Sequence, residues 1–207
     1  MLKGLRPKRI TREIRPMTFV IRPYQPDDLT TLKQITVQAF EPVSIERNIE
    51  STFGIIDGHD WQWRKARHVE QDVSRYPEGV FIAETDGEVV GYITTWIDLD
   101  AGMGFIPNLA VESHVRGQGI GRALIDYALR HFRAAGIRHA RIETLEQNPI
   151  GQTLYPAAGF REVARQIHYC IAIEEDFHAE PQSPTFSRSD APRGNARSDA
   201  LRPQEDK

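Results

Sequence analysis

The sequence predicts a mixed α/β or α+β sheet with helices on both of its faces. Three observations support this class. Two apolar runs flank Asp86-Gly87, a dipeptide typical of a two-residue hairpin turn. A buried strand at 105–111 leads through a glycine-rich turn into an amphipathic helix. Strand and helix patterns then alternate as far as residue 174, so the order is one strand, helices, and then β-β-β-α-β-α-β.

The N-terminal half is expected to contain a strand, two helices and the hairpin. The strand covers 18–23, and the first helix begins at Asp27. The second helix lies within a mixed stretch, 41–76, where apolar residues three or four apart mark one face and an aspartate can cap the N-terminus. These residues are Asp60, Ala66, Val69 and Val73. The hairpin strands cover 80–84 and 89–97.

The C-terminal half is expected to alternate strands and helices. Its elements are the strand 105–111, the helix 118–135 ended by Gly136, the strand 138–145, the helix 149–158 and a last strand at 162–174. Alternating apolar residues predict that last strand, and they are Ile167, Tyr169, Ile171 and Ile173. Cys170 falls on the opposite face, and we interpret it as a packed strand thiol rather than a nucleophile.

Composition divides the chain into a central domain and two tails. Residues 1–16 are strongly basic with Glu13 as their single acid, and we expect a flexible basic arm there, with a nucleic-acid contact as the alternative. The folded domain is expected over 17–177. Residues 178–207 hold almost no large apolar side chains, so that they cannot offset their ordering entropy, and we expect a disordered tail.

The bulk properties of the chain bear on its partners and its compartment. A net charge of −3 over 207 residues gives no general attraction to nucleic acid or anionic lipid. No apolar run has the length needed to cross a bilayer, and the basic N-terminus lacks the apolar stretch of a secretory signal. A single cysteine rules out an internal disulfide framework and suits a reducing compartment. We therefore expect a cytoplasmic protein with no membrane or nucleic-acid partner.

A glycine-rich turn carries the strongest chemical information. Leu109-Ala110-Val111 is a buried strand, and Arg116-Gly117-Gln118-Gly119-Ile120-Gly121 follows it just before a helix. Glycines at a helix N-terminus let unpaired backbone N–H groups approach a phosphate or pyrophosphate closely. A nucleoside triphosphate loop would need Gly-Lys-Ser/Thr here, and a dinucleotide fingerprint would need a third glycine at position 122, where this chain has Arg122.

A second motif identifies the ligand class. Residues 148–160 read Asn-Pro-Ile-Gly-Gln-Thr-Leu-Tyr-Pro-Ala-Ala-Gly-Phe, and Asn148 can cap a helix with Pro149 at its first position. The two motifs, in this order and spacing, resemble those of the GNAT acetyltransferases over residues 18–174, with Gly151 where alanine is usual. The resemblance implies a mixed sheet of about six to seven strands, splayed between the strands at 104–112 and 138–145.

The resemblance also implies a site for acetyl-CoA, with no metal. In the family, loop amides hold the pyrophosphate, and the strand before the loop pairs with the pantetheine arm and polarises the thioester carbonyl. The corresponding residues here are Leu109, Ala110, Val111, Arg116, Gly117, Gln118, Gly119, Gly121, Arg122 and Asn148. Tyr155 is the candidate general acid for the leaving sulfur, with simple packing or a hydrogen bond to the sulfur as the alternative. Pro156 is expected to kink or end its helix.

The general base stays open at this point. Family members often place a glutamate on the strand before the loop, but this chain has Phe105-Ile106-Pro107-Asn108 there. Pro107 also indicates an irregular or edge position. Other carboxylates that merit consideration are Glu41, Asp98, Asp100 and Glu143, although each also fits a solvated or structural role. A water relay, or an amine that arrives neutral, would need no dedicated base.

Aromatic and basic residues crowd into a short stretch before the hairpin. They are His59, Trp61, Trp63, Arg64, Lys65, Arg67 and His68. Their spacing does not match a metal site, and acids follow closely, which weakens a nucleic-acid interpretation. In the family this region shapes the acceptor pocket, so the aromatic residues either line that pocket or pack the helix on the sheet.

The leading hypothesis is an N-acetyltransferase that moves an acetyl group from acetyl-CoA to a primary amine. The alternative is a non-catalytic acyl-CoA-binding regulatory module, which the missing strand glutamate favours. A nucleic-acid-binding protein would account for the basic arm but not for the two motifs. We expect acetyl-CoA and an amine as partners, and a homodimer is compatible with the sequence.

Overall fold

The computed structural model describes residues 18–173, which form a mixed sheet with helices, as the sequence predicts. The strands lie in the order β1-β2-β3-β4-β5, with antiparallel pairs up to β4 and a parallel pair between β4 and β5. Their bounds are β1 Val20–Pro23, β2 Val80–Thr85, β3 Glu88–Asp98, β4 Met103–Val111 and β5 His139–Ile142. The predicted basic arm and the predicted tail lie outside the described residues.

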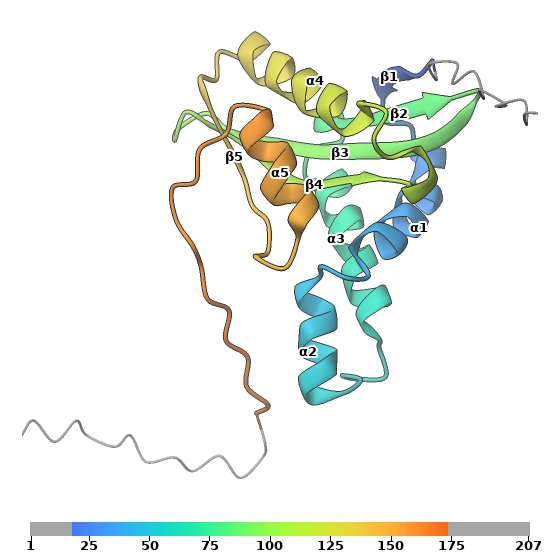
Figure 1. Ribbon diagram of the computed structural model, residues 1–207, viewed down its shortest axis with the longest axis vertical. Coiled ribbons are helices and arrows are strands. Elements are labelled where there is room, and N and C mark those ends of the chain that lie inside the picture. Colours follow the sequence, from blue (N-terminus) through green and yellow to red (C-terminus); the bar gives the residue numbers. More distant parts are fainter. Residues whose placement is uncertain (1–17, 174–207) are drawn as a thin grey trace, which may run out of the picture. The chain divides into compact units, whose positions relative to one another are not determined.

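Two layers of helices cover the sheet (Figure 1). The helices are α1 Leu29–Phe40, α2 Ile45–Phe53, α3 Trp61–Arg75, α4 Ile120–Ala134 and α5 Pro149–Ala157. One core contains residues of α4 with the sheet, with α5 side chains packed against it, and a second core joins α1 and α3 to the other face. None of the helices within residues 18–173 combines the length and the apolar character that a bilayer crossing requires.

The hairpin and the helix ends follow the sequence signals. Asp86 and Gly87 have φ angles of 51° and 83°, as a turn with two left-handed residues requires. Asp60 caps α3 by accepting a hydrogen bond from the Trp63 amide at 2.8 Å. α4 stops at Ala134, and Gly136 follows with a φ of 82°. These local predictions are confirmed because each depends only on neighbouring residues.

Helix α2 is absent from the sequence predictions. Ser44 caps it by accepting from the Arg47 amide at 3.0 Å, so its start has an ordinary signal. None of its side chains is fully buried, however, and it packs chiefly against α3. Its apolar residues Ile45, Ile49 and Phe53 recur every four positions, so the sequence did contain a helical signal within the mixed stretch 41–76.

A β-bulge interrupts β4 at its centre. Ile106 and Pro107 together lie opposite Thr95, because the register shifts between the pairs on either side. The extra residue reverses the alternation of faces, so that Ile106 belongs to the core under α4 whereas Ala110 belongs to the core under α1 and α3. The irregularity that Pro107 predicts is confirmed, and the bulge turns Asn108 toward α3.

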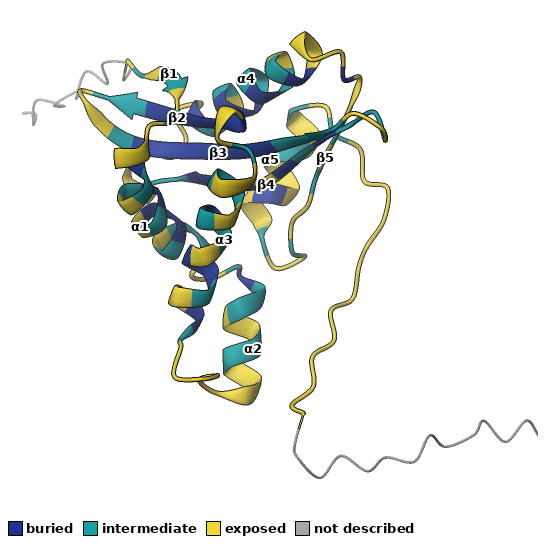
Figure 2. Cartoon of the chain, turned by 180° about the vertical axis from the view of Figure 1, so that it is seen from behind, coloured by how far each residue is buried: buried dark blue, intermediate teal, exposed yellow. Residues whose placement is uncertain are grey.

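The predicted strand at 162–174 is wrong for the residues that the structure describes. Residues 161–173 form no strand, and their side chains are exposed along the whole stretch (Figure 2). Cys170 is therefore exposed, and its interpretation as a packed strand thiol is also wrong. Alternation shows that a segment suits a sheet, but a strand also needs a hydrogen-bonding partner. The described sheet thus has five strands rather than six to seven.

Candidate functional site

The glycine-rich turn joins the end of β4 to the start of α4. Gly117 and Gly119 have φ angles of 78° and 86°, a backbone region that side chains with a Cβ rarely adopt. No atom lies within 4 Å of the place where a Cβ would stand on either glycine. Both glycines are therefore required by the backbone conformation rather than by close packing.

The amides of residues 117–122 have no hydrogen-bond partner in the described part of the chain. The first amide that pairs is that of Ala123, which donates to the Gly119 carbonyl at 3.0 Å. Gly119 is the N-cap and has no side chain to satisfy the first amides of this 15-residue helix. Unpaired N–H groups and the positive end of the helix dipole together suit an anion such as a pyrophosphate.

Two other glycines bring α5 close to the turn. A Cβ on Gly121 would stand 3.3 Å from Leu154 Cδ2, so this glycine allows α4 and α5 to pack tightly. A Cβ on Gly151 would stand 2.5 Å from Thr144 Oγ1, which explains why glycine occupies a position where the family usually has alanine. The sequence predicts Gly121 only as a backbone contact for the cofactor, and the structure adds this packing role.

The strand before the turn has one open edge. Leu109, Ala110 and Val111 pair with β3 on one side. On the other side, the parallel pairing with β5 ends at Ile106 and Ile142, and no strand of the described chain continues it. The two strands therefore part beyond Ile106, at the place where the splay is expected. Backbone groups on this edge are available to an extended ligand.

Three predicted cofactor-binding side chains have partners inside the chain. Arg116 Nε donates to the Val111 carbonyl at 3.0 Å. Arg122 Nε contacts both carboxylate oxygens of Asp126, and its Nη1 donates to the Ala157 carbonyl at 2.6 Å. Asn148 caps α5, accepting from the Gly151 amide at 3.2 Å. The structure thus shows these side chains shaping the loop and α5, whereas Gln118 is exposed beside the free amides.

Tyr155 lies on α5, where its ring packs against the core under α4. Burial raises the pKa of Tyr155 to about 12, so its hydroxyl stays protonated at neutral pH. No side chain or carbonyl among residues 18–173 hydrogen-bonds this hydroxyl, although the ring meets Phe160 edge-on at 6.3 Å. Pro156 lies just before the end of the helix at Ala157, as expected.

The carboxylates considered as bases occupy surface or turn positions. Glu143 follows the end of β5, is exposed and pairs with Arg141. Asp98 accepts a hydrogen bond from the Ala101 amide at 2.9 Å and so holds the turn before β4. Glu41 and Asp100 are exposed as well. On the strand where the family often has its glutamate, this chain has no acid at 105–108, and Phe105 stacks on Trp96 with ring centroids 3.9 Å apart.

A buried polar network next to the open edge escapes the sequence analysis. Asn108 Oδ1 accepts from Lys65 Nζ at 2.9 Å, and Asn108 Nδ2 donates to Asp72 Oδ2 at 2.7 Å. Thr94 Oγ1 donates to the same Asp72 oxygen at 2.6 Å and accepts from the Asn108 amide at 3.1 Å. Asn108, a polar residue within an apolar strand, was a sequence signal for this network. Its partners Lys65 and Asp72 lie 43 and 36 residues away, so the sequence did not reveal them.

Some residues of the aromatic and basic stretch pack inside the domain, and others lie on its surface. Trp61 is only 9% exposed and Lys65 is buried against the Phe40 ring, 4.0 Å from its centroid. Trp63 instead lies on the surface, where it stacks on His59 at 3.6 Å. Packing therefore explains the inner face of α3, and the role of this region in shaping an acceptor pocket stays a prediction.

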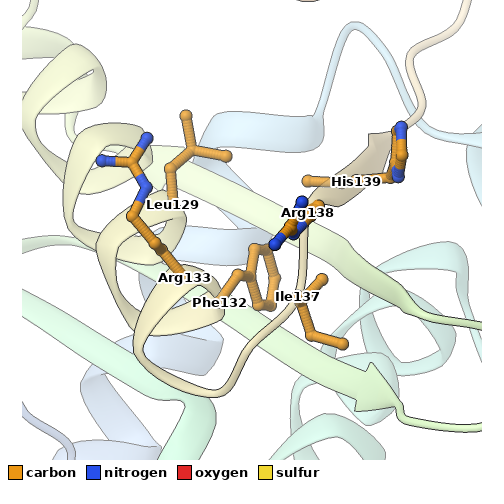
Figure 3. Close-up of a pocket in the computed structure, with 7 residues that line it drawn as sticks. Leu129, Phe132, Arg133, Ile137, Arg138 and His139 are labelled. Carbon is orange, nitrogen blue, oxygen red and sulfur yellow. The ribbon is translucent and has the colours of Figure 1, made fainter.

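The described surface also has a hollow of about 460 Å³ at the far end of α4. Figure 3 shows that Phe132, Ile137 and Arg138 lie around it, between the end of the helix and the start of β5. The whole length of α4, about 22 Å at 1.5 Å per residue, separates this end from Gly119. The hollow therefore does not belong to the candidate site.

Comparisons with known proteins agree with the geometry. The acetyltransferase (GNAT) family matches residues 43–160, more than half of the chain. A mycothiol acetyltransferase of Streptomyces avermitilis is 34% identical over 84 residues, covering 41% of this chain and 27% of that protein. An uncharacterized N-acetyltransferase of Methanocaldococcus jannaschii is 37% identical over 90 residues, covering 43% of this chain and 56% of that protein. The chain thus spans 27% of the length of the first relative and 56% of the length of the second.

A solved structure shows the same fold. The PaiA N-acetyltransferase of Thermoplasma acidophilum, in complex with coenzyme A, superimposes with a TM-score of 0.57 at 22% identity, over 70% of this chain and 91% of that one. This likeness supports the mixed sheet flanked by helices. With a family match over most of the domain and both motifs in place, the chain belongs to the GNAT acetyltransferases.

Proposed function

We propose that this protein is an N-acetyltransferase that moves the acetyl group of acetyl-CoA directly to a primary amine of a small molecule, a peptide or a protein. The observation that supports this most is the run of unpaired amides at 117–122, at the start of α4 and beside the open edge of β4. A pyrophosphate at these amides would leave the pantetheine arm to extend along Leu109–Val111. The thioester would then lie between β4 and α5.

Tyr155 is proposed as the group that protonates the sulfur. Its hydroxyl is protonated at neutral pH because burial raises its pKa to about 12. A free thiol has a pKa near 8.5, which is below the pKa of this phenol. A thiolate in water would therefore seldom take the proton of Tyr155. The leaving thiolate would emerge in the same desolvated site, however, where burial raises the pKa of thiols too. Proton donation, or a strong hydrogen bond, then stabilises the departing sulfur.

We propose a primary amine as the acceptor and name no more specific compound. The curated relatives include mycothiol acetyltransferases, but this chain covers only 27% of the length of the one from Streptomyces avermitilis. That match supports acetyl transfer without indicating the acceptor. We also propose a cytoplasmic location, on the ground that the sequence has a single cysteine.

Incubation with acetyl-CoA and a panel of amines tests the function. Spermidine, lysine, kanamycin, glucosamine and a tripeptide represent the main acceptor classes, and release of free thiol is recorded against a control without amine. Thiol release that depends on one amine, with acetylation of that amine seen by mass spectrometry, is the expected result. A second candidate, the acyl-CoA-binding regulatory module, is favoured by the missing glutamate on the strand before the loop, where this chain has residues 105–108 without an acid. That module would bind acetyl-CoA in calorimetry and release no thiol with any amine.

A further inference from the structure

A histidine and a glutamate form a pair where α2 packs on α3. His68 Nε2 lies 3.2 Å from Glu46 Oε1, and the Glu46 side chain is only 13% exposed whereas that of His68 is 42% exposed. A nitrogen that faces a carboxylate carries the hydrogen, which leaves Nδ1 as the free acceptor. The pair thus combines an accessible proton acceptor with a half-buried carboxylate that orients it.

Two neighbours of His68 on α3 connect this helix to β4. His68, Lys65 and Asp72 share one face of α3, at spacings of three and four residues, and Lys65 and Asp72 both bond to Asn108 of β4. Asn108 directly precedes Leu109, the first strand residue proposed to contact the pantetheine arm.

The start of α2 contacts the loop that precedes α5. Asn48 Nδ2 donates to Gln147 Oε1 at 3.1 Å, and Gln147 Nε2 donates to the Pro42 carbonyl at 3.1 Å. Gln147 immediately precedes Asn148, the cap of α5. Glu46, in the first turn of α2, therefore lies near the contact between this helix and the loop before α5.

Burial favours the neutral form of His68, and the charges around it act in both directions. Burial lowers the pKa of His68, Lys65 lowers it further, and Glu46 and Asp72 raise it. Arg64, one turn earlier on α3, donates to the Glu46 carbonyl and to Glu50 of α2, so it also borders the pair. Because the pKa of His68 is lowered below its ordinary value near 6.5, the imidazole is unprotonated at neutral pH and free to accept a proton.

We infer that His68, oriented by Glu46, is the base that takes the proton from the acceptor amine, an inference that rests on the proposed acetyl transfer. The acceptor arrives as an ammonium ion and gives one proton to His68 Nδ1. The nitrogen lone pair then attacks the thioester carbonyl carbon, and the C–S bond breaks with its electron pair moving to sulfur. The sulfur takes a proton from Tyr155, the second proton lost by the nitrogen restores the Tyr155 hydroxyl, and His68 releases its proton to solvent.

The test compares His68→Gln with the wild type across pH, on the panel amine that is acetylated. We expect kcat/KM at pH 7 to fall by about 10²–10³. The loss should shrink as pH rises toward the pKa of the amine, because the free amine then needs no base. In the wild type, activity should fall on the acid side as His68 becomes protonated, below its ordinary pKa. A purely structural role would lower the rate equally at every pH.

Two further variants sharpen the test. Glu46→Gln removes a carboxylate that raises the pKa of His68, so the acid limb of the wild-type profile should move to lower pH. His131→Gln is the matched control, because His131 is another half-buried histidine with a pKa lowered by burial, on α4 beside Tyr76. Its pH profile should match the wild type. Melting temperatures verify that each variant is folded.

The outcomes separate this inference from the proposed function. If the wild type acetylates an amine and His68→Gln keeps the same rate and profile, His68 is not the base while the transferase stands. If the wild type binds acetyl-CoA but acetylates no amine of the panel, the proposed function and this inference are both overturned. A pH-independent loss in His68→Gln would reduce His68 to a packing residue.

Discussion

The two faces of the sheet are built from different kinds of contact. Under α4 and α5 the core is apolar, and the features that matter for a cofactor are local: a left-handed Gly119, unpaired amides and a cap at Asn148. Under α1 and α3 the core includes a buried lysine and an asparagine, linked across 43 residues of sequence. We expect the first face to bind a cofactor mostly through backbone groups and the second to contact an acceptor through side chains. A backbone site suits a constant cofactor, and a side-chain site suits an acceptor that varies.

The largest effect is expected on the α5 side, from Tyr155→Phe. The substitution removes one oxygen and keeps the ring, so packing against the core should survive while the sulfur loses its proton donor. We expect kcat to fall by about 10²–10⁴ with acetyl-CoA affinity nearly unchanged. Steady-state rates and calorimetry on the same preparation measure the two quantities.

Turnover within twofold of the wild type would reduce Tyr155 to a packing residue. Equal losses of rate and acetyl-CoA affinity would instead make Tyr155 a binding contact. The ring neighbour offers a control: Phe160→Leu alters the apolar contact around Tyr155 without touching its hydroxyl.

On the α3 side, the largest effect on stability is expected from Asn108→Ala. The change removes the side-chain partner of Lys65, which is 8% exposed, and one of the donors to Asp72. Buried groups that keep their charge without a hydrogen bond destabilise a protein, and we expect a loss of about 2–3 kcal/mol in the free energy of unfolding. Urea denaturation measures it.

A double variant tests whether the loss of stability comes from Lys65, which Asn108→Ala leaves without its hydrogen-bond partner. Lys65→Met removes the charge, so Asn108→Ala should cost clearly less in that background. Asn48→Ala, at an exposed hydrogen bond with Gln147, should change stability by less than about 0.5 kcal/mol. Equal costs of Asn108→Ala in both backgrounds would contradict the network as a source of stability.

The next effect concerns the cofactor seat. Gly119→Glu places a side chain and a negative charge at a left-handed residue beside the free amides. The dissociation constant for acetyl-CoA should therefore rise more than tenfold, which corresponds to a loss of about 1.4 kcal/mol or more in binding free energy. Gly102→Glu is the control, because Gly102 also has a positive φ, 65°, and open space, but lies in the turn before β4. Calorimetry that finds the same affinity in a folded Gly119→Glu protein would contradict the proposed pyrophosphate site at these amides.

The comparison also shows why sequence patterns predicted one face better than the other. The glycine turn, the caps at Asp60 and Asn148 and the Asp86-Gly87 hairpin each depend on residues within a few positions, and all of these elements form. The contacts of Lys65 and Asp72 with Asn108 depend on a bulge that turns β4 by one residue, and an isolated sequence does not reveal such a shift. The missed α2 did carry apolar residues at helical spacing, and the wrong strand at 162–174 has the right alternation without a partner strand.

The smallest effect compares one local feature on each face. Asn148→Ala and Asp60→Ala each remove a side chain that accepts from a helix amide, at 3.2 Å in α5 and 2.8 Å in α3. Each loss should lower the free energy of unfolding by about 1 kcal/mol, which is the usual cost of removing a helix cap. Asn148→Ala should also weaken activity, because the capped turn precedes Tyr155 on a short helix, whereas Asp60→Ala should leave activity unchanged. Melting curves and rates measured on both variants check this, and a loss of activity in Asp60→Ala alone would show that the start of α3, rather than that of α5, controls the site.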